Sequence, residues 1–120
     1  MNLHVLTALT ALALVVAPGL AAQALPDTAA RHAVGRSAVV VGVVAQVKDR
    51  SHRGYAYLNF GGAYPQHTFS VWIPDSVGTR FGDLQRFVGK RVRASGEVWL
   101  QNNEWPAMTI TDPKDLEIVQ

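Results

Sequence analysis

The 120-residue chain contains no cysteine. This absence excludes a disulfide framework, a thiolate-ligated metal, a cysteine nucleophile and a lipid-modified amino-terminal cysteine. At this length the chain has room for one domain rather than two. A stabilising hydrophobic core therefore has to form without covalent cross-links.

Residue patterns typical of catalysis are also lacking. His32, His52 and His67 have spacings that match no metal-binding motif, and we expect His52 and His67 to be exposed to solvent. No serine lies in a nucleophile elbow, no glycine-rich loop opens a helix, and no two carboxylates occupy matching strand positions. Asp112 and Asp115 flank a Pro-Lys turn, which explains them without a ligand. We therefore expect a protein that is not an enzyme, with no cofactor and no bound metal.

The first 24 residues differ from the rest, since 17 of them are apolar and none is charged. Leu3–Ala17 is an almost continuous apolar run that Pro18-Gly19 interrupts. This run is shorter than the roughly 20 residues that a membrane-spanning helix needs. Ala22-Gln23-Ala24 offers small residues at the two positions that signal peptidase recognises. The pattern predicts a signal peptide over 1–24, cleaved before Leu25, and hence a periplasmic or secreted protein without stable membrane insertion. No Lys or Arg precedes the run, so a retained amino-terminal anchor or a buried helix is the alternative.

Two segments follow the predicted signal peptide. Residues 25–37 are rich in alanine, proline and small polar residues and show no periodicity, so we expect a flexible lead-in. Residues 38–120 are expected to form the folded domain. After cleavage the chain would have an ordinary apolar fraction and enough residues for one modest core.

Period-two alternation of apolar and polar residues, which is typical of β-strands, recurs five times after residue 38. The five segments are Val39–Lys48, Tyr55–Phe60, Thr68–Ile73, Lys90–Leu100 and Pro106–Thr111. Between the third and fourth segments, Phe81, Leu84 and Val88 have helical spacing, and nearby glycines confine a helix to about Asp83–Val88. Gly42 in the first segment predicts a bulge or a sharp bend there.

The order strand, strand, strand, helix, strand, strand is that of the OB-fold, a five-stranded Greek-key barrel with its helix between strands three and four. An SH3-like barrel has no helix at that point. A β-sandwich needs more strands than this chain supplies. We therefore predict an all-β OB-fold with one short helix.

Four stretches of the sequence resemble a known family. They are residues 57–61 (YLNFG), 69–71 (FSV), 89–96 (GKRVRASG) and 106–118 (PAMTITDPKDLEI). Together they look like the OB-type nucleic-acid-binding domain of exported bacterial proteins, including a carboxyl-terminal accessory domain of some staphylococcal-nuclease-like proteins. The resemblance covers roughly residues 36–119. Nuclease-like proteins carry catalysis in a separate domain, for which this chain has no room, so the resemblance implies a binding module rather than a nuclease.

The alternation also predicts which side chains face solvent. If the apolar residues of strands two and three point inward, the outward set contains Tyr55, Tyr57, Asn59, Ser70 and Trp72. OB-folds hold oligonucleotides or sugars on this face. Aromatic rings there can stack on any base, or on a sugar ring. The same rings could instead support only cross-strand pairing or pack under the lead-in segment.

Basic residues provide the second indication of a ligand. The net charge is +6 over residues 27–93 and −4 over residues 94–120. Lys48, Arg50 and Arg53 lie in or beside the first hairpin loop, and Arg91 and Arg93 point outward from strand four. Such a cluster can contact several phosphates, although a solvated charged face that maintains solubility is the alternative.

These features predict a small exported binding module for single-stranded nucleic acid or another extended polymer such as an oligosaccharide. The alternative is an envelope module in which the same surface docks a partner protein. Trp99 and Trp105, on either side of the last hairpin, are expected to pair across it. The sequence leaves the oligomeric state open.

Overall fold

The computed structural model describes residues 23–120. Almost all of the predicted signal peptide lies outside these residues, and its expected boundary, between Ala24 and Leu25, falls within the first strand, β1 (Ala24–Pro26). No helix in residues 23–120 is long and apolar enough to cross a membrane.

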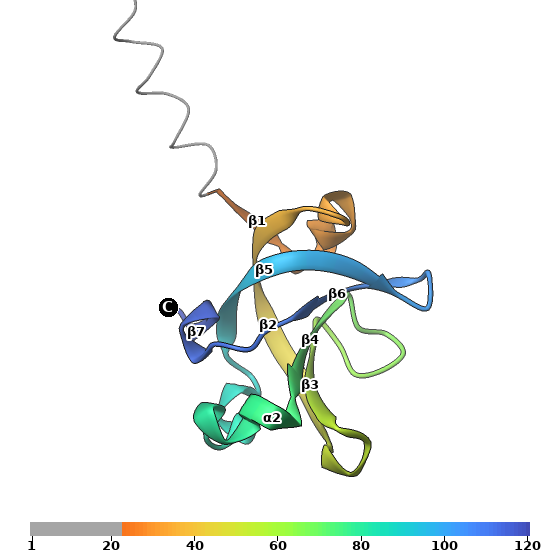
Figure 1. Ribbon diagram of the computed structural model, residues 1–120. Coiled ribbons are helices and arrows are strands. Elements are labelled where there is room, and N and C mark those ends of the chain that lie inside the picture. Colours follow the sequence, from red (N-terminus) through yellow and green to blue (C-terminus); the bar gives the residue numbers. More distant parts are fainter. Residues whose placement is uncertain (1–22) are drawn as a thin grey trace, which may run out of the picture.

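Five strands close into a barrel: β2 (Ser37–Arg50), β3 (Tyr55–Phe60), β4 (Phe69–Pro74), β6 (Trp105–Thr109) and β5 (Arg91–Gln101) (Figure 1). Each pairs with the next in that order, and β5 pairs with β2 to complete the ring. The pairings are antiparallel except for β4 with β6, which is parallel. The predicted all-β, OB-fold-like barrel is confirmed.

The long first barrel strand, β2, contributes to two parts of the barrel. Its first half pairs with β5 and its second half with β3, with a bulge between Val44 and Gln46. The bulge therefore lies after Gly42, which keeps regular pairing with Val92. Gly42 is needed for a different reason: a Cβ there would lie 2.7 Å from the Asp27 carboxylate.

The segment between β4 and β5 contains three short helical pieces, where one helix was predicted. They are α2 (Asp75–Gly78), η4 (Thr79–Phe81) and η5 (Leu84–Phe87). Gly82, at a φ of +67°, separates the last two, and the Asp83 carboxylate caps η5 by accepting from the Gln85 backbone N–H. Phe81 and Phe87 are buried, so this segment closes one end of the barrel (Figure 1).

The segment expected to be a flexible lead-in, residues 25–37, instead closes the opposite end, so that prediction was wrong. β1 pairs in parallel with β2, and η2 (Asp27–Ala33) contacts β2, β4, β5 and β6 (Figure 1). Ala30 and Ala33 are buried in the core, and the Thr68 hydroxyl donates a hydrogen bond to the Asp27 carboxylate. Because only Ala30, Ala33 and the partly buried Leu25 make its apolar contacts, the segment carries no hydrophobic periodicity.

The remaining elements are short. η3 (Ser51–Arg53) forms the tip of the β2–β3 hairpin, and η6 (Pro113–Asp115) leads into β7 (Leu116–Ile118), which pairs with β5. The interior is filled by side chains from the barrel strands and from both end segments. Its largest buried side chains are Phe60, Phe69, Phe81, Phe87, Leu58, Ile73, Met108 and Ile110.

The role of η2 in closing this end of the barrel can be tested with a matched pair of substitutions. Ala30→Asp places a charge in the core, and we expect it to lower the free energy of unfolding by about 3 kcal/mol or more. Thr28→Asp, on an exposed position of the same element, should have little effect. Chemical denaturation measures both. Equal, small effects would mean that residues 27–33 are not part of the folded core.

Candidate functional site

The outward face of β3 and β4 carries aromatic side chains. Leu58 and Val71, which pair across the two strands, are fully buried, whereas Tyr57 and Trp72, the next pair, are half-buried. The direction of the side chains predicted from the alternation is therefore confirmed for these four residues. It gives the barrel an aromatic exterior over two of its strands.

Four rings form one continuous aromatic surface: Tyr55, Tyr57, Trp72 and Trp99. The Trp72 ring centroid lies 4.4 Å from that of Tyr55 and 5.4 Å from that of Tyr57, with the rings nearly parallel. Trp99 of β5 meets Trp72 edge-on at 5.5 Å. The indole N–H groups of Trp72 and Trp99 donate to the hydroxyls of Ser70 and Thr109, so both indoles are held in place.

Asn59 and Ser70, predicted to be exposed ligand-binding residues, are each only 1% exposed. Both do lie on the outward side of the sheet, opposite one another. The Asn59 side-chain amide donates to Gln46 Oε1 at 2.7 Å, and Ser70 accepts from Trp72. These two residues support the aromatic surface and its neighbours and are not available to a ligand.

The loop between β3 and β4, residues 61–68, carries a second group of rings. Its Tyr64 and His67 stack with a centroid distance of 5.6 Å, and both contact Trp105 at the start of β6. Tyr64 is 56% exposed, but His67 is only 6% exposed, so the expectation of a solvated His67 was wrong. The loop thus lies over the part of the sheet that would otherwise expose Asn59.

An open groove of about 370 Å³ runs beside the aromatic surface. Tyr57 and Tyr64 line it, as do Lys48 and Arg50 of β2. Lys48 pairs directly with Tyr57, and Arg50 with Tyr55, which places both cations next to the rings. The polar side chains that complete the lining are Gln46, Gln101 and Asn102. The groove therefore combines stacking faces, two cations and three amides.

The structure divides the predicted basic cluster. Arg53 is exposed in η3 and does not line the groove. Arg91 and Arg93 pair with Val43 and Val41, in the part of β2 before the bulge. Arg93 also forms an ion pair with Glu117 of β7 at 2.7 Å. These three arginines are thus not brought to the groove, and only Lys48 and Arg50 remain.

Several residues in and around the groove have positions or roles that were not predicted from the sequence. Trp99 and Trp105 were expected to pair with each other, but Trp99 lies opposite Ala107, and Trp105 lies opposite Gln101. Gln46 lies on the same face as Lys48, two residues away, but it was not singled out as a ligand-binding residue; the bulge instead reverses the direction of the residues before it, so that Val44 is buried. Tyr64 belongs to a loop, where alternation says nothing about direction.

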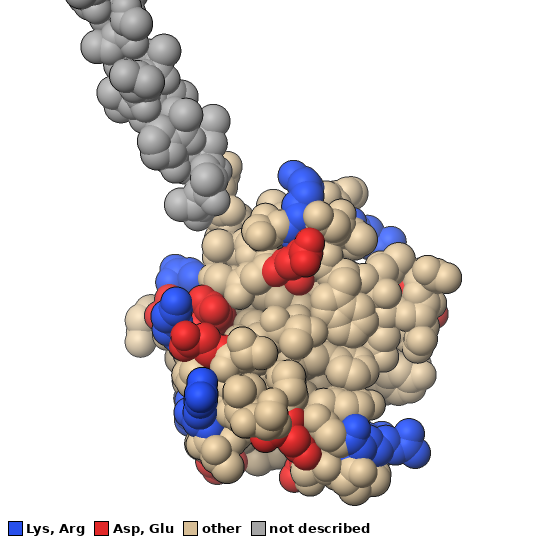
Figure 2. All heavy atoms as spheres, in the orientation of Figure 1, with Lys and Arg blue, Asp and Glu red and all other residues tan. Residues whose placement is uncertain are grey.

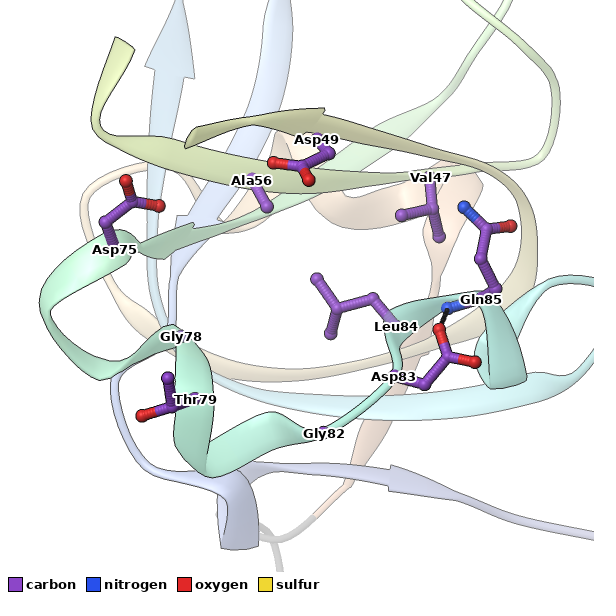
Figure 3. Close-up of a pocket in the computed structure, with 10 residues that line it drawn as sticks. All are labelled: Val47, Asp49, Ala56, Asp75, Gly78, Thr79, Gly82, Asp83, Leu84 and Gln85. Atoms are coloured by element: carbon purple, nitrogen blue, oxygen red, sulfur yellow. Dashed lines mark hydrogen bonds between the residues drawn. The ribbon is translucent and has the colours of Figure 1, made fainter. Parts of the chain in front are cut away.

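A second pocket of about 500 Å³ lies at the other side of the β2–β3 hairpin, beneath η5 (Figure 3). Leu84, Val47 and Ala56 form its apolar part, and Asp49, Asp75 and Asp83 lie around it. Asp49 and Asp83 accept hydrogen bonds from nearby backbone N–H groups. Asp49 and Asp83 therefore stabilise local turns. Residues 23–120 contain no group of His, Asp or Glu placed to hold a metal ion.

Charge is distributed unevenly over the molecule. In the view of Figure 2, charged side chains lie mainly around the margin, and the area over β4, β6 and the adjoining loop carries few.

No protein-family model matches the sequence, and no curated protein is significantly similar to it. The groove and the aromatic surface are therefore the features from which a function can be inferred.

The burial of His67 generates a pH prediction. Desolvation lowers the pKa of His67 below its usual 6.5, and the nearby Glu104 carboxylate opposes this shift only in part. The unfolded chain therefore binds a proton at a higher pH than the folded one does. As the pH falls from above 6.5 toward the pKa of the folded state, the free energy of unfolding should decrease.

Thermal denaturation between pH 8 and pH 5 measures this effect. His67→Gln should remove that part of the pH dependence, although it also removes the stacking on Trp105 at every pH. His52→Gln, in the exposed tip η3, is the matched control and should leave the pH dependence unchanged. An unaltered pH profile in His67→Gln would show that this histidine does not titrate differently on folding.

Proposed function

We propose that this protein is a non-enzymatic binding module that holds single-stranded nucleic acid, or another extended polymer such as an oligosaccharide, across the aromatic surface and the adjoining groove. The observation that carries the proposal is the direct cross-strand pairing of Lys48 with Tyr57 and of Arg50 with Tyr55. Each pair places a cation beside an aromatic ring. The ring can stack on a base while the cation contacts the phosphate attached to that base.

Stacking would supply much of the affinity. A base that stacks on an aromatic side chain contributes about 1–3 kcal/mol, and every base has a suitable face. Within the aromatic surface Trp99 contacts only Trp72, edge-on, whereas Tyr57 stacks on both Tyr55 and Trp72 and also lines the groove. Two or three rings of the polymer could be bound this way without any change in the barrel.

Electrostatic attraction would supply the rest of the affinity. Among the described residues that line the groove, Lys48 and Arg50 are the charged ones, and no carboxylate joins them. Contacts between cations and phosphates release counterions, so the affinity falls as the salt concentration rises. With only two cations in place, we expect a modest salt dependence.

Export is part of this proposal. The apolar segment before residue 18 and the small residues before Leu25 support a periplasmic or secreted location. The four stretches that resemble the nucleic-acid-binding domain of exported bacterial proteins support the same conclusion. The mature protein would then bind its ligand outside the cytoplasm, where polymers from lysed cells and from the envelope are both present.

A protein partner is the second candidate ligand. It is favoured by the exposed Tyr64 ring next to the half-buried Trp105, because tyrosine and tryptophan dominate the energetic centres of protein interfaces. Affinity purification from an envelope extract distinguishes the two candidates. A partner that is retained at high salt and lost on Trp72→Ala would support protein docking, provided that the variant still folds.

The principal test is titration of a fluorescent single-stranded oligonucleotide at several salt concentrations. The logarithm of the binding constant should fall linearly with that of the salt concentration, and Lys48→Gln and Arg50→Gln should each reduce the slope by about 0.7. Arg91→Gln is the matched control, since it removes the same charge at a position away from the groove. No binding tighter than millimolar at low salt would eliminate nucleic acid as the ligand.

A further inference from the structure

The Gln46 side chain is held in one orientation by two hydrogen bonds. Its Oε1 accepts from the backbone N–H of Tyr64 at 3.1 Å and from the Asn59 side-chain amide at 2.7 Å. A backbone N–H can only donate, so the Gln46 atom that faces it has to be the oxygen. The opposite side of the amide is therefore its Nε2 group, which can only donate.

That Nε2 group is available to a ligand. Gln46 lines the groove, and among the described residues no side-chain or backbone acceptor bonds to its Nε2. The one buried side-chain polar atom without a partner in residues 23–120 is His67 Nδ1, so Gln46 Nε2 is not sealed from solvent. It therefore presents free N–H groups to the groove.

The neighbouring groups have the same hydrogen-bonding character. Lys48 and Arg50 are donors only, because neither an ammonium nor a guanidinium group has an acceptor. Together with Gln46 they give the β2 side of the groove three donors in alternate positions along one strand. A ligand group on this side has to accept hydrogen bonds. A ligand group that donates would face these three donors and form no hydrogen bond with them.

We propose that a base in the groove turns its position 4 toward Gln46, so that the groove selects a keto group over an amino group at this position, and hence thymine or uracil over cytosine. This inference rests on the proposed function, since it concerns a base stacked beside Tyr57. Thymine carries an oxygen at position 4, whereas cytosine carries an NH₂ donor there. The two bases are similar in size and stack on the same ring, but they also differ at N3, which donates in thymine and accepts in cytosine, so the amino group at position 4 is isolated by comparing cytosine with 2-pyrimidinone.

Homopolymers of thymidine and of deoxycytidine with equal length test the proposal in the wild-type protein. One hydrogen bond gained and one donor clash avoided should favour the thymidine polymer by about three- to tenfold. An oligomer of 2-pyrimidinone, with hydrogen at position 4, should bind between the two. Because these measurements alter only the ligand, they cannot be affected by misfolding of a variant.

Gln46→Glu is the corresponding test in the protein. The carboxylate has the same shape and still accepts from Tyr64 and Asn59, so the two supporting hydrogen bonds are retained, but the free NH₂ becomes an acceptor. The ratio of the binding constants for the thymidine and deoxycytidine polymers should fall to one or reverse in favour of cytosine. Gln101→Glu introduces the same charge on the other side of the groove and should weaken both polymers alike, leaving their ratio unchanged.

The outcomes separate this inference from the function on which it rests. If both polymers bind with equal affinity, or if Gln46→Glu keeps the wild-type ratio, Gln46 does not read the base and the inference is overturned, while binding itself stands. Equal affinities would also be the result if Gln46 contacted a phosphate. If neither polymer binds at low salt, the proposed function and this inference both fail.

Discussion

The pairing of β3 with β4, in a register that places Leu58 opposite Val71 and Tyr57 opposite Trp72, determines the rest of this structure. A strand directs successive side chains to opposite faces, so one register decides both the core and the exterior. All four phenylalanines are buried, and all three tyrosines and all three tryptophans lie on or beside the outward face. Tyrosine and tryptophan each carry a polar group that needs a partner, which makes them suited to a half-exposed surface.

The barrel and the aromatic surface could be predicted because they depend on local patterns. The β3 segment, Tyr55–Phe60, was predicted with the bounds that the structure gives it, and β4 differs by one residue at each end. Alternation over six residues is enough to set the direction of Tyr57 and Trp72. The position of Lys48 and Arg50 beside those rings follows from the short β2–β3 hairpin, which fixes the register of the two strands.

What could not be predicted depends on contacts between distant segments. The bulge after Val44 reverses the alternation of β2, so that Val44 is buried while Gln46 faces outward with Lys48, and loop 61–68 then covers Asn59. The element η2, which closes one end of the barrel, is held by two buried alanines and by the hydrogen bond from Thr68 to Asp27. None of these contacts produces a periodic signal in the sequence. Arg91 and Arg93 point outward as expected, but the curvature of the barrel separates them from the groove.

The most direct test of the account is an NMR titration that follows the three tryptophan indole N–H signals as a single-stranded thymidine oligomer is added. Trp72 and Trp99 belong to the aromatic surface, whereas Trp105 stacks on His67 beside it. We expect the signals of Trp72 and Trp99 to shift most, together with the backbone signals of Lys48 and Tyr57. Shifts confined to the pocket beneath η5, with both indole signals unmoved, would contradict the assignment of the ligand to this face.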